Sequence, residues 1–456
     1  MIITKNERLL QIATIFTLIL ATPTKLYAAE PAYVLDENAP SSSADELKGS
    51  LLSTDQTEPW RGSFFPKLKE KLRKLPPFIR DTKLGVNFRT FDFRRDTDGS
   101  NNNAALAVGG EIEYQSGDLF DRVSIGASYY TSQKINGADN EGPTLLLKPL
   151  HTGFDVLGQS YINFRFNEEI NFRAFRQSFN LPYLNRQDGR MVPNTHEAYV
   201  LTGVNAIPKI NFITGYVHKM KSRNSDSFEH ISSRAGATET NDGLYMAGAR
   251  YKFNEDSNFS VINYYSFNVM NILYAEGNHI INSGKRIPIK LAAQFTNQHS
   301  IGDENIGNFN ANTGGIKASI SYRGFLLNAA GTITSKDSNI RSPYGGRPGY
   351  LSLMLRDFDR AGENAWLVGL TYDFSSIGIN GLTVFSNYAE GYTPDSGNAA
   401  SPDQTEFNIT FDYQPKISFL EQFKLRYRYA QLDQDGTGAI DRTENQIILN
   451  WEIPLL

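Results

Sequence analysis

The chain has 456 residues, a formal net charge of −4 and no cysteine. The lack of cysteine excludes a disulfide framework, a zinc–thiolate site and a thiol nucleophile. The slightly acidic balance is not typical of a nucleic-acid-binding protein. Tyrosine and phenylalanine are abundant, with 23 and 29 residues against 3 tryptophans, and these residue types favour β-strands.

Residues 1–29 are predicted to form a secretory signal peptide. Lys5 and Arg8 precede the apolar run Leu9–Ala21, which is shorter than the ~20 residues that a spanning helix needs. Cleavage is expected after one of the two alanines that end this range. The chain is therefore predicted to be exported from the cytoplasm.

Residues 30–80 are predicted to form a separate N-terminal segment. Its first part, residues 30–62, is polar and rich in Ser, Asp and Glu, as mobile segments are. Its second part has a helical hydrophobic spacing between basic residues, carried by Phe65, Leu68, Leu72 and Leu75. This pattern predicts a short basic amphipathic helix. The helix could plug a pore or contact anionic lipid head groups, but a solvated helix resting on the rest of the protein is the favoured interpretation.

Beyond Thr82 the hydrophobic period changes to two, which is the period of a β-strand. Leu84, Val86 and Phe88 alternate with polar residues in the first such segment. The same alternation recurs at residues 161–166, 289–296, 316–323, 366–374, 407–413 and 447–453. No long helical pattern accompanies these segments, so no helices are expected to cover their apolar faces.

The clearest alternation lies near the end of the chain, in Phe423–Tyr429. One face of this strand carries only apolar and aromatic residues, and the other carries Lys424, Arg426 and Arg428. An apolar face without a covering layer suits lipid, and a cationic face then lines water. The pattern is typical of an outer-membrane β-barrel with a positively charged lumen.

The connections between the strands alternate in length. Residues 254–257 and 377–381 form short turns. The long loops are residues 96–103, 136–149, 222–240, 301–313, 336–349 and 393–404. Short turns on one rim and long loops on the other are typical of such barrels, and a strand with its connection takes about 20 residues here. Residues 81–456 are therefore predicted to form an all-β, transmembrane antiparallel barrel of about 18 strands, with 16 as the alternative.

Three segments resemble the OprD family of substrate-selective porins of Gram-negative outer membranes. They are Leu84–Asp96, Leu181–Pro193 and Gly349–Phe374, and the most specific part is the stretch around Asp357–Phe374. The resemblance extends from about Pro77 to the end of the chain. It implies a monomeric, 18-stranded barrel with a narrow lumen in the outer membrane. Residues 30–80 are interpreted as a periplasmic segment from their own sequence, and the part before Pro77 is longer than the family leads us to expect.

The resemblance also implies a basic ladder, a lumenal row of arginines and lysines that conducts small solutes bearing a carboxylate. The ladder candidates are Arg89, Arg190, Arg426 and Arg428, with Lys424 as an additional member. Arg165 and Arg173 are weaker candidates, chosen by their lumen-facing position on a neighbouring strand. Gln446 departs from the family, which tends to place an arginine there.

The ladder arginines could also have a purely structural role. Inward-facing arginines could pair with carboxylates such as Asp373 and Asp412 and only stiffen the wall. Three tyrosines, Tyr183, Tyr344 and Tyr350, lie in Gly- and Pro-containing loops that are expected to fold inward and constrict the pore. They could grip the apolar or cationic part of a solute, but packing is the favoured role for each one.

The sequence thus predicts a porin, and not an enzyme, for the passive and selective uptake of aromatic acids, organic acids or amino acids. A general or neutral-sugar pore is the alternative, and an outer-membrane lipase ranks lowest. The six histidines show no metal-binding spacing, and no cofactor motif occurs, so neither a metal nor a cofactor is expected. The expected partners are small anionic solutes, outer-membrane lipid and lipopolysaccharide, but no nucleic acid, for a monomer or loose oligomer.

Overall fold

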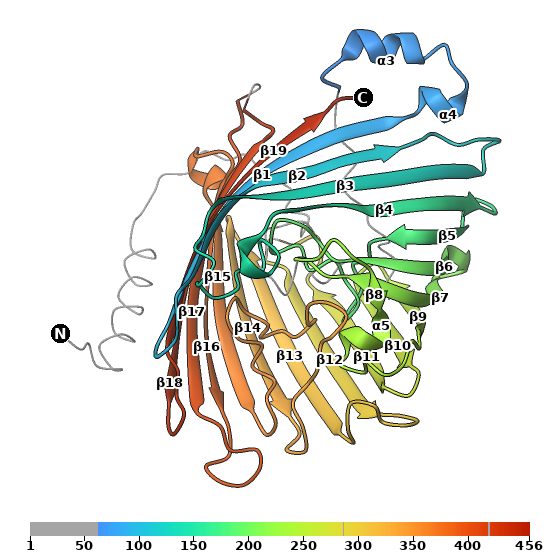
Figure 1. The fold of residues 1–456 in the computed structure, drawn as a ribbon. Coiled ribbons are helices and arrows are strands. Elements are labelled where there is room, and N and C mark those ends of the chain that lie inside the picture. Colours follow the sequence, from blue (N-terminus) through green and yellow to red (C-terminus); the bar gives the residue numbers. More distant parts are fainter. Residues whose placement is uncertain (1–62, 286, 418–419) are drawn as a thin grey trace. The chain divides into compact units, whose positions relative to one another are not determined.

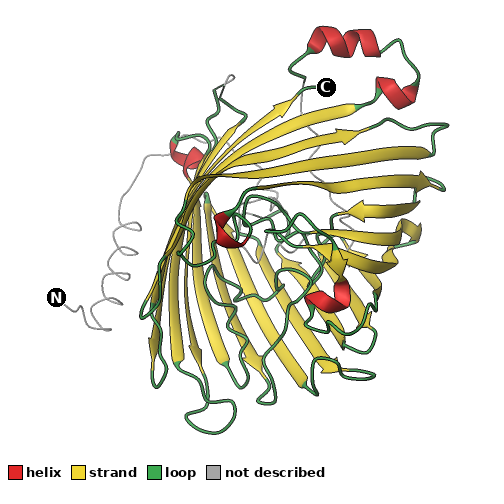
Figure 2. Cartoon of the chain, in the orientation of Figure 1, coloured by secondary structure: helices red, strands yellow, loops and turns green. Residues whose placement is uncertain are grey.

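The protein is represented by a computed structural model that describes residues 63–285, 287–417 and 420–456. The predicted signal peptide and residues 30–62 lie outside the described residues. Residues 63–456 form a β-barrel in which strands make the wall and loops occupy part of the interior (Figures 1 and 2).

Eighteen strands make the wall of the barrel. The wall strands are β1 Lys83–Thr97, β2 Asn103–Gln115, β3 Val123–Asn136, β4 Phe154–Arg165, β5 Ile170–Gln177, β6 Thr195–Ile207, β7 Ile210–Lys221, β9 Leu244–Asn254, β10 Ser257–Ser266, β11 Met270–Ile281, β12 Ile289–Ser300, β13 Asn310–Tyr322, β14 Phe325–Thr334, β15 Asn364–Asp373, β16 Leu382–Tyr392, β17 Asp403–Tyr413, β18 Phe423–Asp435 and β19 Arg442–Pro454. A further two-residue strand, β8 Glu229–His230, pairs with the end of β7.

The barrel closes where the first wall strand meets the last. β1 pairs antiparallel with β2 on one side and with β19 on the other. At this seam Phe88 lies opposite Trp451, with ring centroids 5.8 Å apart. Within the described residues each wall strand is paired on both sides, which is what lipid demands of a sheet. The prediction of an all-β antiparallel barrel with 18 strands is therefore confirmed.

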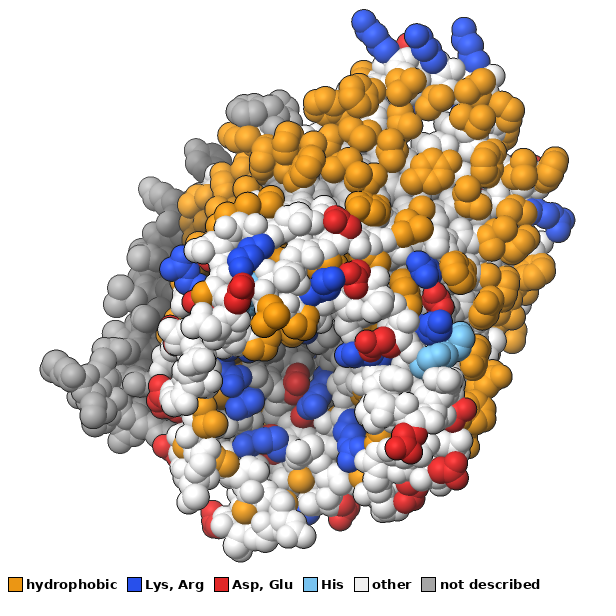
Figure 3. Space-filling model, viewed as in Figure 1, with side chains coloured by type: hydrophobic (Ala, Val, Ile, Leu, Met, Phe, Trp, Pro, Cys, Tyr) orange, Lys and Arg blue, Asp and Glu red, His pale blue; other side chains and the backbone are white. Residues whose placement is uncertain are grey.

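The period-two pattern separates an apolar outer face from a polar inner one, as β18 illustrates. Leu425 and Tyr427 are 43% and 37% exposed on the outside, whereas the inward-facing Arg428 is 8% exposed. Large apolar side chains are exposed on many other wall strands, among them Phe88, Ile316, Trp366, Ile447 and Leu449. A space-filling view shows this apolar belt along the outer wall (Figure 3). Such a surface is stable when lipid covers it.

Helical pieces are few and short. α3 Pro66–Leu72 and α4 Pro77–Arg80 precede β1, the 3₁₀ turns η1 Pro149–His151 and η2 Phe374–Ile377 lie in connections, and α5 Ile231–Arg234 follows β8. None of the described helices is long and apolar enough to cross a membrane. α3 lies inside the stretch predicted to be an amphipathic helix, and it ends at Leu72.

The two rims of the barrel differ as the sequence predicts. One rim holds the short turns, such as Gly324 between β13 and β14, together with the start of β1 and the end of β19. The other rim holds the long loops, of which residues 178–194, between β5 and β6, and residues 335–363, between β14 and β15, matter most for the site. The second of these is longer than the predicted loop, which ended at Gly349.

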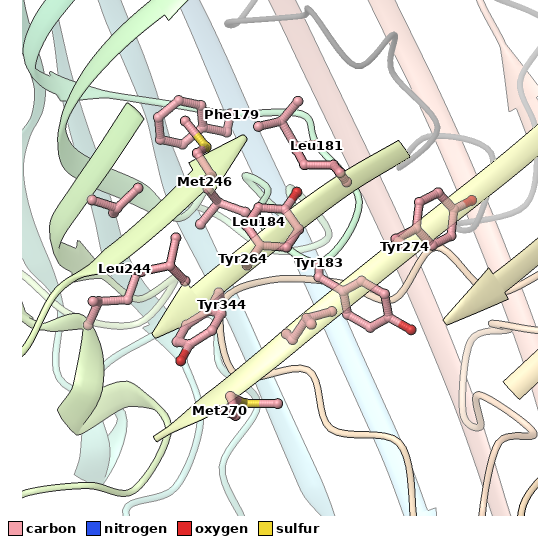
Figure 4. Packing of buried hydrophobic residues seen from close by; sticks show 14 of the residues in the cluster. Phe179, Leu181, Tyr183, Leu184, Leu244, Met246, Tyr264, Met270, Tyr274 and Tyr344 are labelled. Atoms are coloured by element: carbon pink, nitrogen blue, oxygen red, sulfur yellow. The ribbon is translucent and has the colours of Figure 1, made fainter. Parts of the chain in front are cut away.

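Residues 178–194 are fixed to the inner wall by an apolar cluster. Phe179, Leu181 and Leu184 are fully buried against inward-facing wall residues such as Val200 and Ile262. Figure 4 shows these loop side chains packed among Leu244, Met246, Met270 and Tyr264, with Tyr344 from the second loop beside them. Burial of each large apolar side chain contributes about 1.5–3 kcal/mol, so the loop is held as a fixed part of the lumen.

Candidate solute channel

Residues 178–194 and 335–363 are called here the first and second inward loops. A cavity of about 1040 Å³ runs between these loops and the inner wall. Its described lining comes from β1, from the strands β15 to β19 with the short turns between them, from residues 143–145 between β3 and β4, from Arg223 after β7, and from the two inward loops. The positive lining residues are Arg89, Arg95, Arg186, Arg190, Arg223, Arg347, Arg356, Lys416, Lys424, Arg426 and Arg428, and the negative ones are Asp188, Asp357, Asp373 and Asp412. Figure 3 shows blue and red side chains gathered in a hollow of the surface. The described lining is therefore strongly positive.

The three cations predicted on β18 all line this cavity. Arg426 donates two hydrogen bonds to the Asp412 carboxylate of β17, at 2.6 and 2.9 Å. Lys424 lies 2.9 and 3.0 Å from the two carboxylate oxygens of Glu452 on β19. Asp412 was considered as a partner from the sequence, whereas Glu452 was not. The neighbouring carboxylates therefore neutralise most of the charge of these two cations.

The third β18 cation contacts a neutral side chain. Arg428 donates to the amide oxygen of Gln446, at 3.5 Å, the position where the family tends to have an arginine. Gln446 itself donates to Glu444, a fully buried carboxylate of β19 that also pairs with Arg95 at 2.5 Å. Glu444 therefore adds a negative charge to the wall beside the positive lining.

Arg89 of β1 acts as an anchor for the first inward loop. Its guanidinium donates to Asp188 at 2.7 Å and to the backbone carbonyl of Arg190 at 2.5 Å. Burial would raise the pKa of Asp188, but the charges of Arg89 and Arg186 outweigh this effect and lower it. Asp188 is therefore a permanent negative partner, and Arg89 holds residues 188–190 against the wall.

Arg190, which lies in the loop between β5 and β6, has no carboxylate partner among the described residues. It donates to the backbone oxygens of Thr144 and Gly189, at 3.0 and 2.7 Å, and it lies 4.7 Å above the ring of Phe93. Burial and the nearby charge of Arg223 lower the pKa of Arg190 to about 9. The site therefore disfavours an additional positive charge and favours an anion.

Two further loop arginines were not predicted as site residues. Arg223 follows β7, and within the described chain its side chain makes no hydrogen bond or ion pair. Burial lowers its pKa to about 10. Arg356, in the second inward loop, likewise has no side-chain partner in the described part, and its Nε atom is buried without one. Arg356 stands inside the Gly349–Phe374 segment that carries the family resemblance, so a signal for it was present in the sequence.

The position of Arg356 is set by a carboxylate of the wall. Glu406 of β17 is fully buried and accepts backbone N–H hydrogen bonds from Met354, Leu355 and Arg356, at 2.9, 3.2 and 2.8 Å. A carboxylate that accepts several N–H groups at once holds them firmly, because each is a charge-assisted hydrogen bond. The turn that presents Arg356 to the cavity is therefore fixed to the wall.

Comparison with known proteins identifies the fold and the family. The family model described as "outer membrane porin, OprD family" matches residues 76–455. The chain belongs to the OprD family. It is thus a porin of the Gram-negative outer membrane, a transport channel and not an enzyme.

Individual relatives of this porin are distant in sequence. The porin-like protein GalP of Pseudomonas putida is 22% identical over 404 residues, which cover 83% of this chain and 93% of GalP. The crystal structure of OccK9 (OpdG) of Pseudomonas aeruginosa has a TM-score of 0.75 and 21% identity, over 83% of this chain and all of that one. The structure of OpdK of the same species with vanillate has a TM-score of 0.74 and 19% identity, over the same shares.

The three predicted constriction tyrosines of this porin do lie in its inward loops, but their side chains face away from the cavity. Tyr183, Tyr344 and Tyr350 are at most 3% exposed, and none of them lines the cavity. Tyr183 donates to Thr296 of the wall at 3.0 Å. All three side chains are thus packed within the protein.

The two weaker ladder candidates lie elsewhere in the porin. Arg165 pairs with Asp118 at 2.7 Å, near a short turn. Arg173 stacks on the ring of Tyr161, at 4.2 Å from its centroid. Neither residue lines the cavity. Across the described residues, no three His, Asp or Glu side chains come together as metal ligands would.

Proposed function

We propose that this porin admits small carboxylate-bearing solutes by passive diffusion, and that arginines of the lumen bind them in transit. The observation that carries the proposal is the charge of the cavity lining, in which cations far outnumber carboxylates among the described residues. A narrow, water-filled passage focuses the field of fixed charges and raises the local concentration of anions. The guanidinium fork can hold a carboxylate through two hydrogen bonds.

The lining cations are not equivalent in this role. Arg426 and Lys424 are paired with Asp412 and Glu452, so each can offer an anion little net charge. Arg190, Arg223 and Arg356 form no ion pair within the described residues. We assign the main anion-binding role to these three loop arginines, called here the loop trio. The paired cations of the wall would then shape the passage, and Arg89 would hold the loop.

A series of weak sites suits a channel better than one strong site. A solute must bind well enough to enter and weakly enough to leave. The trio comes from three different connections, after β5, β7 and β14, so a carboxylate could pass from one guanidinium to another. The solved relative OpdK was crystallised with vanillate, an aromatic carboxylate, which supports solutes of this class.

A neutral-sugar pore is less well supported. Sugar passage favours a track of aromatic rings, but Phe91 and Tyr413 are the only aromatic residues in the described lining. The excess of cations would add nothing to the passage of an uncharged solute. Uptake of a sugar and of a carboxylate of similar size, compared in the same vesicles, separates the two functions.

Planar-bilayer recording tests the proposal. The variant with Arg190, Arg223 and Arg356 changed to Gln should lose most of its anion preference in a salt gradient. Block of the current by small carboxylates should weaken by about tenfold for each site lost, or ~1.4 kcal/mol.

The control for each single Arg→Gln change is Arg94→Gln, which removes one positive charge from an exposed side chain outside the cavity. It should leave selectivity and block unchanged. If the triple variant keeps the anion preference and carboxylate block of the unaltered porin, the proposal is wrong. A panel of aromatic, aliphatic and amino acids as blockers then narrows the solute class.

A further inference from the structure

A strongly amphipathic segment stands on the rim that carries the short turns. This rim segment, Phe64–Ile79, contains α3 and most of α4. Its exposed large apolar side chains are Phe64, Phe65, Leu68, Leu75 and Ile79, each between 41% and 57% exposed. Contiguous exposed apolar groups of this kind mark a surface that another phase or partner covers.

The same segment is rich in positive charge. Five cations occur within ten residues, against the single acidic residue Glu70, and they are Lys67, Lys69, Lys71, Arg73 and Lys74. None of the five forms an ion pair with a described residue. Their charge is therefore available to an external anion.

The rim segment is tied to the barrel at both ends. Near its start, the backbone N–H of Phe64 donates to the carbonyl of Pro454 at 2.6 Å. Near its end, the carbonyl of Phe78 accepts from the N–H of Gly117 at 2.9 Å. These tethers hold α3 at the rim, and Figure 1 shows it beyond the barrel opening, beside the C-terminus. The segment therefore does not act as a plug of the lumen.

The apolar and basic side chains of the rim segment are arranged as in a segment that lies on a membrane surface. In Figure 3 the apolar surface of the barrel wall continues onto the rim segment, and basic side chains project beyond it at the top of the view. An amphipathic helix in the plane of an interface buries its apolar side chains at the acyl boundary and places Lys and Arg among the head groups. Continuity with the lipid-facing belt favours lipid over a soluble partner as the covering phase.

We propose that the rim segment binds anionic phospholipid head groups of the membrane leaflet that faces the short turns. Short turns lie on the periplasmic side of outer-membrane barrels, so this is the periplasmic leaflet. Each lysine or arginine near an anionic surface adds to the attraction, and the apolar side chains supply the anchor. The segment would fix the height of the barrel in the membrane and gather anionic lipid around its mouth.

The experiment uses the lack of cysteine in the chain, because a single introduced cysteine can be labelled uniquely. Leu68→Cys and Lys71→Cys, each in the full-length mature porin, carry an environment-sensitive fluorophore. The two proteins are reconstituted into nanodiscs of phosphatidylcholine alone or mixed with phosphatidylglycerol. In the mixed discs the label at position 68 should shift to the blue and be quenched by spin-labelled lipid, and the label at position 71 should respond much less.

A charge variant separates the ionic part from the apolar part. Lys67 and Lys71 are exposed and Lys69 is half-buried, and none of α3 is buried. Changing these three lysines to Gln should therefore let the barrel assemble, which its shift on unheated gels checks. In this background the response of the label at position 68 to phosphatidylglycerol should be lost. High salt should reduce the response of the unaltered segment, since salt screens such attraction.

Three results would overturn the proposal. One is a label at position 68 that stays exposed to water in both kinds of disc. A second is an equal response in discs without anionic lipid. A third is protection that needs added peptidoglycan, which would assign the segment to the cell wall. None of these readouts depends on which solute the porin conducts.

Discussion

At the scale of single residues, the ability of a lumenal arginine to attract an anion depends on whether a carboxylate already neutralises it. Arg426 is held by both oxygens of Asp412, whereas Arg356 has no side-chain partner in the described chain. An ion pair in contact with water contributes only about 0–1 kcal/mol to stability. The wall pairs therefore do little for folding, and their main consequence is a local cancellation of charge.

This reasoning predicts opposite effects for the two members of one pair. Asp412→Asn should increase anion selectivity, because Arg426 would lose its neutralising partner. Arg426→Gln should decrease it, because Asp412 would remain as an uncompensated charge. The reversal potential across a salt gradient, recorded from single channels, measures both effects.

The double variant is the control for this prediction. With both charges removed, the selectivity should return close to that of the unaltered porin. If Asp412→Asn lowers anion selectivity or leaves it unchanged, then Asp412 is not what prevents Arg426 from attracting anions.

At the scale of elements, the inward loops are fixed parts of the channel and not mobile lids. Apolar burial holds residues 178–194, as the complete burial of Leu181 and Leu184 shows. Polar anchors hold residues 352–357, through Glu406 and its three backbone donors. Ion pairs add to this, since Arg347 contacts Asp359 within the same connection. The width of the passage is thus set by loop-to-wall contacts.

Glu406→Gln should release the turn that presents Arg356. The amide has one oxygen acceptor in place of two, and its NH₂ group would face backbone donors, so the substitution should cost about 1–3 kcal/mol. Hydrogen exchange of residues 352–357 should accelerate, and single-channel current should become noisier.

The wall itself should remain intact in this variant, because Glu406 makes these contacts to the loop. Thermal unfolding of the barrel and exchange in β17 serve as the reference. Faster exchange throughout the barrel, with no difference between loop and wall, would show that Glu406 supports the wall in general.

At the scale of the whole molecule, the alternation of side chains along each strand gives the barrel one face for lipid and one face for water. Closure of β1 on β19 turns every outward position toward lipid and every inward position toward the lumen. The outer belt carries large apolar side chains such as Leu425 and Tyr427, and the lumen carries the charges. The barrel therefore owes its place in the membrane to the belt and its selectivity to the lumen.

A charge placed on the belt should destabilise the whole barrel. Leu425→Arg exposes a guanidinium to hydrocarbon. Leu425 is near the start of β18, so we expect the free energy of unfolding to fall by an amount between the ~1 kcal/mol of an interfacial position and the ~2–4 kcal/mol of a midplane position. Urea titration of the porin in lipid vesicles measures this loss. Leu425→Phe, which keeps the position apolar, should unfold close to the unaltered porin, and equal stability of the two variants would contradict a lipid-facing role.

The period-two segments were enough to predict the barrel, because a lipid-facing wall must alternate and must close. The spacing of the strands left 16 or 18 open, and the structure has 18. The resemblance to the OprD family added the five principal ladder candidates, all of which line the cavity. Arg223 and Arg356 were not predicted as site residues because a side chain on an irregular loop has no direction that the sequence pattern reveals. The extent of residues 335–363 was underestimated because an irregular loop also has no periodic pattern. For Arg356 the family resemblance of its segment was the one available signal.

The sequence by itself determined which surfaces exist, an apolar one and a cationic one, because side-chain direction along a strand follows from position alone. The sequence also determined the number of charged residues and the amphipathic pattern of the rim segment. Only the tertiary structure decided which cations are neutralised. The pair Arg426–Asp412 depends on the register of β17 against β18, and the hold of Glu406 on Arg356 joins residues 50 positions apart in the chain. Such contacts are set by how distant segments meet in the lumen, which no local pattern encodes.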